Sequence, residues 1–182
     1  MFGRIQNIDN RVLDNISRIH KPVLNKIMIT ASRAGNAGIV WWAVCLPFLI
    51  NSNWRATGAN FVFGLAWAHL MGEIIIKHIV KRVRPCHTLD DDEQLIDRPR
   101  FYSFPSGHTT ASFAMVGVAL MRCKVITFMP ILMLAMLIAF SRIYLRVHYL
   151  TDVIAGMILG LTCGICSVLI FNTVVPMWFP MV

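Results

Sequence analysis

The chain has 182 residues, of which 57% are apolar and only 14% are Asp, Glu, Lys or Arg. Soluble domains have about 25% charged residues, so this composition excludes a water-exposed globular surface. The mean hydropathy of +0.63 agrees and predicts one membrane-embedded domain over residues 1–182. The net charge of +8 arises from basic residues that lie between apolar runs, which favours anionic lipid or phosphate over nucleic acid as the partner.

Residues 1–34 are predicted to form an amphipathic segment that lies on the membrane surface. Apolar side chains recur there at steps of three and four, at Ile5, Ile8, Val12, Ile16 and Ile19. The opposite face carries Asn, Asp and Arg, as in helices that rest in the interface plane. Pro22 interrupts this helix, and a weaker amphipathic pattern continues to residue 34.

Residues 35–182 are predicted to form the transmembrane core, an all-α bundle of about five membrane-spanning helices. The apolar runs cover about residues 37–50, 57–80, 109–121, 125–144 and 153–171. Five crossings would put the amino terminus, the polar stretch 81–108 and the connection after residue 144 on one side. Tryptophans near the span ends are predicted to anchor the helices at the interfaces: Trp41, Trp42, Trp54 and Trp178.

Neither the Cys163-x-x-Cys166 pair nor the acidic run at residues 90–93 predicts a metal site. The cysteine pair has no accompanying histidine or second cysteine pair, so we interpret it as helix packing. The acidic run lacks the alternating ligands and the turn glycine of a hard-cation loop, so we interpret it as a solvated loop. No metal and no cofactor are predicted, and the pattern makes no prediction of oligomeric state.

The first of three polar blocks stands at the end of the second apolar run. Lys77, Lys81 and Arg84 are spaced four and three apart, so they would share one face of a helix that Pro85 ends. Three cations on one face repel each other unless an anion lies there. Taken alone, this block favours the alternative of an interfacial basic cluster that binds lipid headgroups.

The second block, Pro105-Ser106-Gly107-His108, is a turn that leads into the third apolar run. The free N–H groups at the start of that helix would form an anion site, and Gly107 would let a ligand approach the backbone. The alternative is ordinary capping by Ser106 with His108 at the interface.

The third block joins the fourth and fifth runs and contains Arg142, His148 and Asp152. The last two residues are four apart, so a carboxylate could bond one ring nitrogen and leave the other as a nucleophile or base. The alternative is a helix cap by Asp152 beside an interfacial histidine. Ionisable groups at a membrane boundary are costly, which favours a functional role.

Together the blocks resemble the three-part motif of the type-2 phosphatidic acid phosphatase superfamily. The matching residues are Lys77-x6-Arg84-Pro85, Pro105-Ser106-Gly107-His108 and Ser141-Arg142-x5-His148-x3-Asp152. The resemblance implies a lipid phosphatase that uses no metal. It assigns His148 as the nucleophile that becomes a phosphohistidine, Asp152 as its orienting carboxylate and His108 as the acid that protonates the leaving oxygen. It assigns the phosphate oxygens to Lys77, Arg84, Ser106, Gly107 and Arg142.

The substrate expected from a compact membrane relative of this family is undecaprenyl diphosphate, with phosphatidic acid and phosphatidylglycerophosphate as alternatives. A non-catalytic lipid-binding or transport protein is the alternative of another class. The intact pair of His148 and Asp152 argues against it, because binding alone needs only cations. Soluble haloperoxidases, which share the motif, are excluded by the composition.

The side of the membrane that the site faces is a separate prediction. Of the 17 Lys and Arg residues, all except Arg55, Arg122 and Lys124 fall on the predicted side of the active loops. The positive-inside tendency would place that side in the cytoplasm. Carrier-lipid phosphatases of the family are expected to face outward, and an amphipathic helix can carry its charges on either face. We therefore expect a multi-pass protein of the cell membrane with an extracytoplasmic site.

Overall fold

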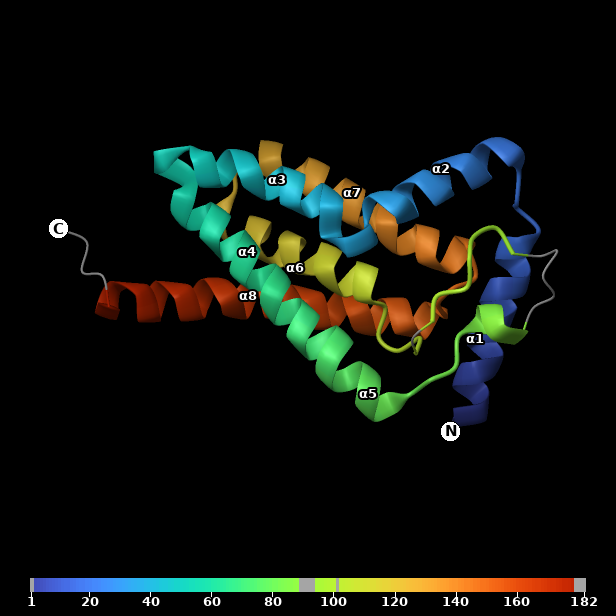
Figure 1. Cartoon of the computed structure of the whole chain (residues 1–182). Helices are drawn as coiled ribbons and strands as arrows, with labels where there is room; N and C mark the ends of the chain where they lie inside the picture. The colour runs from blue at the N-terminus through green and yellow to red at the C-terminus, as the bar shows by residue number, and fades with distance from the viewer. Residues whose placement is uncertain (1, 89–93, 101, 179–182) are drawn as a thin grey trace.

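The computed structural model describes residues 2–88, 94–100 and 102–178, and all regular elements in these ranges are helical (Figure 1). The α-helices are α1 (Phe2–Ser17), α2 (Pro22–Ala34), α3 (Ile39–Ile50), α4 (Arg55–His69), α5 (Lys77–Val80), α6 (Gly107–Arg122), α7 (Val125–Tyr144) and α8 (Leu150–Trp178). A π-helical segment, Leu70–Ile76, joins α4 to α5. The predicted all-α class is confirmed.

Helix α6 is the centre of the bundle, and α8 packs closely against it. A Cβ added at Gly160 would lie 2.2 Å from the carbonyl oxygen of Thr110, and one at Gly164 would lie 2.2 Å from that of Ala114. Small residues permit this close approach of two membrane helices. The packing extends to the ends of the helices, where Ser106 N–H donates to the carbonyl oxygen of Asp152 over 3.1 Å. The starts of α6 and α8 are thereby fixed side by side.

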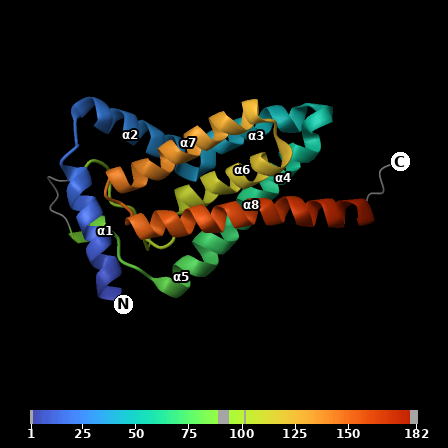
Figure 2. The ribbon, with the colours of Figure 1, turned by 180° about the vertical axis from the view of Figure 1, so that it is seen from behind.

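The outer face of α7 is apolar and exposed, as expected for a surface that meets lipid. Ile126 is 81% exposed and Met133 is 67% exposed, whereas Ala135 and Ile138 on the inner face are fully buried. Seen from behind, α7 and α8 run along the bundle and α1 lies across their end (Figure 2). Because apolar groups of this size rarely stay exposed to water together, the bundle is membrane-embedded.

Three helical stretches in the described ranges are long and apolar enough to cross a membrane: Ser52–Thr88, Val125–Tyr144 and Leu150–Phe171. A fourth crossing results if Pro22–Ala34 and Asn36–Ile50, which are bent by 58°, form one broken span. Helix α6 has 16 residues, slightly fewer than the roughly 17 needed for a crossing, and most of its central residues are buried. The count of five crossings stays a prediction.

The polar connections gather at one end of the bundle, as predicted. The described residues between α5 and α6 and the connection 145–149 lie together there, and α1 packs across this end (Figure 1). The prediction for Trp41 is wrong, because this side chain is fully buried and its Nε1 donates to Ser112 Oγ over 3.1 Å. Trp42 and Trp54 are about half exposed, at 52% and 54%. The side chain of Trp178 lies outside the described part of the chain.

Candidate active site

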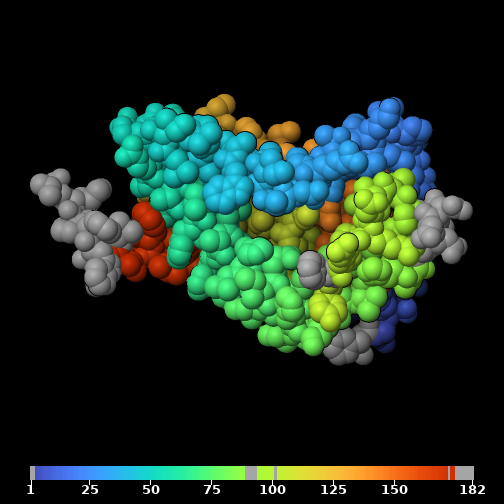
Figure 3. All heavy atoms as spheres, viewed as in Figure 1, coloured from blue at the N-terminus to red at the C-terminus, as the bar shows by residue number. Residues whose placement is uncertain are grey.

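A cavity of about 1240 Å³ opens at the polar end of the bundle. The space-filling view shows the surface hollowed between α3 and α4–α5, with atoms of α6 at the floor (Figure 3). Six of the eight predicted site residues line this cavity: Lys77, Arg84, Gly107, His108, Arg142 and His148. The other two, Ser106 and Asp152, are fully buried behind its wall.

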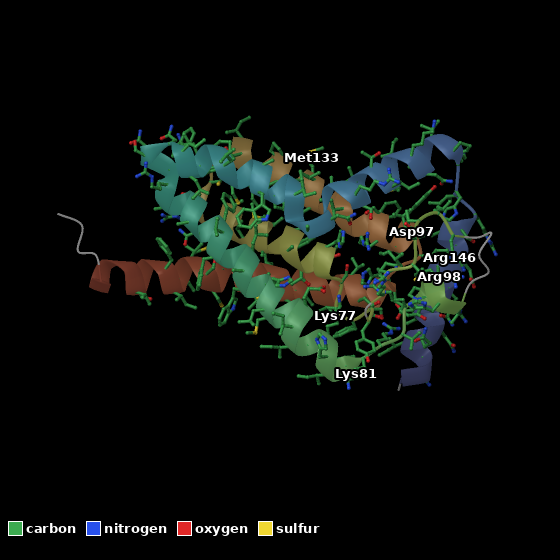
Figure 4. The ribbon with its side chains drawn as sticks, viewed as in Figure 1. Lys77, Lys81, Asp97, Arg98, Met133 and Arg146 are labelled. Carbon is green, nitrogen blue, oxygen red and sulfur yellow. The ribbon has the colours of Figure 1, made fainter. Side chains whose placement is uncertain are left out.

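The positions of Lys77, Lys81 and Arg84 differ from those that their helical spacing predicted. Helix α5 ends at Val80, and Lys81 takes a left-handed backbone conformation with φ of 51°. Lys81 is therefore exposed at the outer tip of α5 (Figure 4), and Arg84 follows in a non-helical segment. The prediction of one shared helical face is wrong. Lys77 and Arg84 nevertheless both enter the site, with exposures of 3% and 4%.

Arg84 and Arg142 approach the cavity from opposite segments. Arg84 Nη1 donates to the carbonyl oxygen of Val147 over 3.0 Å and lies 2.8 Å from His148 Nε2. Arg142 is 3% exposed, and its Nη1 donates to the hydroxyl of Ser32 on α2. Arg142 Nε is buried and has no hydrogen-bond partner in the described residues. Arg142 therefore has donor capacity that an anion in the cavity could use.

The described residues that line the cavity carry an excess of positive charge. Its lining includes two acidic residues, Glu73 and Asp97, and five basic ones, namely Arg33, Lys77, Arg84, Arg98 and Arg142. Three of these cations, Lys77, Arg84 and Arg142, are buried, and gathering buried cations is costly unless an anion compensates them. The cavity is therefore suited to a ligand with two or more negative charges.

The contact with Arg84 determines the tautomer of His148. A guanidinium only donates hydrogen bonds, so Nε2 of His148 must be the acceptor and Nδ1 must carry the proton. Burial first, and then the charges of Arg84 and Arg142, hold the pKa of the His148 imidazole well below its usual value of 6.5. The residue is thus a neutral ring whose Nε2 lone pair accepts from Arg84, and attack by Nε2 would require Arg84 to transfer this hydrogen bond to an oxygen of the ligand.

Asp152 lies behind the ring of His148, but at a distance that is too long for a hydrogen bond. Its Oδ2 is 3.7 Å from Nδ1 and accepts the backbone N–H of Tyr149 over 2.9 Å. Its Oδ1 accepts from Arg82 Nη1 over 2.7 Å. The predicted pairing is therefore one of proximity in this structure, and the carboxylate is oriented by Arg82 and Tyr149.

His108 stands at the start of α6, where its Nε2 lies 2.8 Å from Oδ1 of Asn36. Asn36 belongs to the bend between α2 and α3, so this bend holds the imidazole at the cavity wall. Ser106 behaves differently from the prediction. Its hydroxyl accepts from Thr109 Oγ1 over 2.9 Å, makes no capping bond, and does not line the cavity.

Glu73 is a site residue that the sequence reasoning missed. Its Oε1 lies 2.5 Å from Lys77 Nζ, and a Cβ added at Gly107 would lie 1.9 Å from the same oxygen. The carboxylate therefore occupies the space between a lysine and the first turn of α6. Glu73 sits in the π-helical segment, in which the N–H of Lys77 bonds to the carbonyl oxygen of Gly72. Such segments are frequent at functional sites.

Comparison with known proteins decides the family. A family model described as the PAP2 superfamily matches residues 57–176, which is more than half of the chain. The chain belongs to the PAP2 superfamily. It is 33% identical over 178 residues to an undecaprenyl-diphosphatase of Sulfolobus acidocaldarius, covering 95% of this chain and 84% of the relative. It is 27% identical over 171 residues to phosphatidylglycerophosphatase B of Bacillus subtilis, covering 86% and 80%.

Solved structures of the superfamily agree with the fold. The crystal structure of Aquifex aeolicus LpxE superimposes with a TM-score of 0.74 at 25% identity, covering 86% of this chain and 92% of that one. Membership makes this PAP2 chain a phosphatase that hydrolyses phosphoester bonds. Arg82 falls at an unspecified position within the motif, and Glu73 and Asn36 lie outside it. Only Glu73 had a signal in the sequence, because a carboxylate inside an apolar run is seldom without a role.

Proposed function

We propose that this PAP2 protein is a metal-independent membrane lipid phosphatase that works through a phosphohistidine at His148. The observation that carries the proposal is the position of His148 Nε2, a lone pair on the wall of a cationic cavity and 2.8 Å from Arg84. Phosphoryl transfer requires mainly positioning and stabilisation of negative charge. Fixed guanidinium and ammonium groups supply that stabilisation here.

The first chemical step transfers the phosphoryl group to the enzyme. Nε2 of His148 attacks phosphorus, the P–N bond forms, and the bond from phosphorus to the leaving oxygen breaks. His108 donates a proton to that oxygen, which leaves on the lipid product: a lipid phosphate from a diphosphate, or a lipid alcohol from a monophosphate. In the second step His108 takes a proton from water, the water oxygen attacks phosphorus, and the P–N bond breaks to release inorganic phosphate.

The remaining predicted residues hold the reacting groups. Lys77, Arg84 and Arg142 bind the phosphate oxygens, together with the backbone N–H groups at Gly107. Ser106 acts by fixing the turn before α6, since its hydroxyl is bonded to Thr109. Asp152 stabilises the positive charge that the His148 ring gains when it carries the phosphoryl group. Its 3.7 Å distance to Nδ1 shortens when the ring becomes cationic.

The substrate we propose is undecaprenyl diphosphate, which would be converted to undecaprenyl phosphate. The cavity wall changes from charged to apolar away from His148, where it is lined by Trp42, Val62 and Leu65. An elongated lipid tail could leave the site along this wall while its phosphate stays among the cations. The 33% identity to an undecaprenyl-diphosphatase supports a polyprenyl tail, and the relative named phosphatidylglycerophosphatase B supports the alternative of a glycerolipid.

We propose further that the site faces outward. A label at Asp91, in the acidic run, would test this, but Asp91 lies outside the described part of the chain. His87 is exposed on the segment that follows α5. A single cysteine introduced as His87→Cys in a cysteine-free background should react with a membrane-impermeant maleimide in whole cells. Labelling only after the cells are broken would place the site in the cytoplasm.

The function is tested by phosphate release in detergent with EDTA present. Undecaprenyl diphosphate, phosphatidic acid and phosphatidylglycerophosphate are compared at equal surface concentration, and His148→Ala is the control. We expect release from the diphosphate to be fastest and His148→Ala to lower it by ~10³-fold or more. Unchanged release by His148→Ala would contradict the mechanism, and a faster reaction with phosphatidylglycerophosphate would contradict the substrate.

A further inference from the structure

Behind the nucleophile, three charged side chains from distant parts of the chain form one buried row. Arg82 Nη1 donates to Asp152 Oδ1 over 2.7 Å, and Arg82 Nη2 donates to Asp9 Oδ2 over 2.7 Å. Both carboxylates are fully buried, and the Arg82 side chain is 20% exposed. The row connects α1, the segment after α5 and the start of α8.

The guanidinium of Arg82 is held on all sides. Its plane lies over the ring of Tyr149, with 3.9 Å between the guanidinium carbon and the ring centroid. The two terminal nitrogens also donate to Thr151 Oγ1 over 2.7 Å and to Gln6 Oε1 over 2.9 Å. A side chain with this many partners has one orientation, so it can fix the carboxylate that it contacts.

Asp9 is tied to the first turn of α8 as well as to Arg82. Its Oδ1 accepts the backbone N–H of Thr151 over 3.0 Å, and its Oδ2 accepts the hydroxyl of Thr151 over 2.6 Å. Thr151 precedes Asp152 directly. The N-terminal helix, predicted from its pattern to lie only on the membrane surface, thus reaches the residue next to Asp152.

We propose that Arg82 and Asp9 are positioning residues that hold Asp152 beside His148, so that α1 is a functional part of the active site. The proposal rests on the phosphohistidine mechanism. The physical reason is charge balance in a buried row. Arg82 keeps Asp152 ionised and oriented, but it also neutralises part of the charge that Asp152 exerts on the His148 ring. Asp9 on the far side of Arg82 offsets that loss, because one guanidinium is shared between two carboxylates.

The proposal separates catalysis from substrate binding. Asp9→Asn keeps the shape of the side chain but removes its negative charge. The positive charge of Arg82 then acts on Asp152 alone. The ring of His148 is then less able to become positive, so the chemical step slows. The cations of the cavity are untouched, so binding of the phosphate should not change. A role limited to docking α1 would instead lower stability and leave the kcat of the folded enzyme unchanged.

A double-mutant cycle tests the proposal: Asp9→Asn, Arg82→Gln and the double variant are compared by kcat, KM and melting temperature. We expect Asp9→Asn to lower kcat by ~10-fold with KM within ~2-fold, and Arg82→Gln to lower kcat by ~10²-fold. If Asp9 acts through Arg82, the double variant should have the kcat of Arg82→Gln alone. Arg82→Lys should recover part of the loss, because lysine restores the positive charge but not the planar set of hydrogen-bond donors of the guanidinium.

Leu13→Ala is the matched control for docking. Leu13 lies on the same helix, is 5% exposed and carries no charge, so its truncation loosens α1 without changing the buried row. It should lower the melting temperature and keep kcat within ~2-fold at a temperature where the protein is folded. His148→Ala separates the two proposals, since its activity tests the mechanism and not the role of α1.

Three results would overturn the proposal. One is an unchanged kcat for Asp9→Asn while His148→Ala is inactive. Another is losses for Asp9→Asn and Arg82→Gln that multiply in the double variant, because independent effects add in free energy. The third is a fall in kcat for Leu13→Ala equal to that for Asp9→Asn. An active His148→Ala would instead contradict the phosphohistidine mechanism itself, and the positioning role with it.

Discussion

The two sides of the His148 ring have opposite surroundings. On the cavity side, Nε2 contacts Arg84, and the basic residues that line the cavity outnumber the acidic ones. On the far side, Nδ1 faces Asp152, and the buried row there alternates carboxylate, guanidinium and carboxylate within the protein. The first side is suited to a ligand that would balance its charge, whereas the charges of the buried row on the second side are already paired with one another. Changes on the first side should therefore alter binding and chemistry together, whereas changes on the second should alter chemistry alone.

Removing a cavity cation should give the largest effect. Arg84→Ala deletes a donor to the phosphate and the contact with Nε2, so we expect kcat/KM to fall by ~10²–10³-fold. Arg84→Lys should recover only part of this loss, because an ammonium cannot donate two parallel hydrogen bonds. Steady-state kinetics on detergent-solubilised enzyme measure both. A kcat/KM for Arg84→Ala within a factor of three of the wild type would contradict its place at the phosphate.

Lys77 and Arg84 show which features of the site residue spacing can predict and which it cannot. Their residue types and order identified the family and predicted convergence at one membrane edge. The geometry behind that convergence was not predictable, because the left-handed turn at Lys81 ends α5 and a non-helical segment returns Arg84 to the cavity. The span at residues 125–144 was predicted with its observed bounds, since an unbroken apolar run has one stable form in lipid.

The burial of Asp9 and its contact with Arg82 could not be predicted from the sequence pattern. Asp9 belongs to the polar face of an amphipathic helix, and nothing in its spacing distinguishes it from an exposed aspartate. Its burial depends on Thr151 and Arg82, which are 142 and 73 residues away in the chain. Ser106 shows the converse. Its place in the motif predicted a hydroxyl on the phosphate, and packing of α6 turned that hydroxyl toward Thr109.

Glu73 is a negative charge on the cavity side of the His148 ring, where most of the charged groups are positive. Its carboxylate contacts Lys77 where phosphate oxygens would bind, so a substrate must displace it. Glu73→Gln keeps the volume and removes the competing charge. We expect vanadate and inorganic phosphate to inhibit this variant at ~10-fold lower concentration, which corresponds to about 1.4 kcal/mol.

Asp97→Asn is the matched control for Glu73→Gln. It removes the same charge from an exposed residue of the cavity lining, where solvent screens the interaction. We expect its inhibition constants to stay within ~2-fold of the wild type. Equal gains for both variants would mean that the effect is one of net charge and that Glu73 does not occupy the phosphate position.

The pH dependence of stability tests the neutral state of His148 and should be the smallest effect. The folded pKa is lowered, so below about pH 6.5 the unfolded chain takes up a proton that the folded one does not. Unfolding free energy in the absence of ligand should therefore fall on acidification, by up to about 1.4 kcal/mol per pH unit from this residue. The contribution of His148 is the difference between wild type and His148→Asn in the pH dependence of the unfolding free energy, measured from pH 7.5 to 5.5. An identical pH dependence in both would contradict a buried neutral imidazole.

The most direct test of the phosphohistidine mechanism is to trap the intermediate. Enzyme mixed with substrate labelled in its terminal phosphate is quenched in alkali within the first turnover, digested and sequenced by mass spectrometry. The phosphohistidine mechanism predicts an alkali-stable, acid-labile phosphoryl group on His148, absent from His148→Ala and accumulated when His108→Ala slows the attack of water. Label on another residue, or turnover of wild-type enzyme with no labelled protein at any quench time, would contradict it.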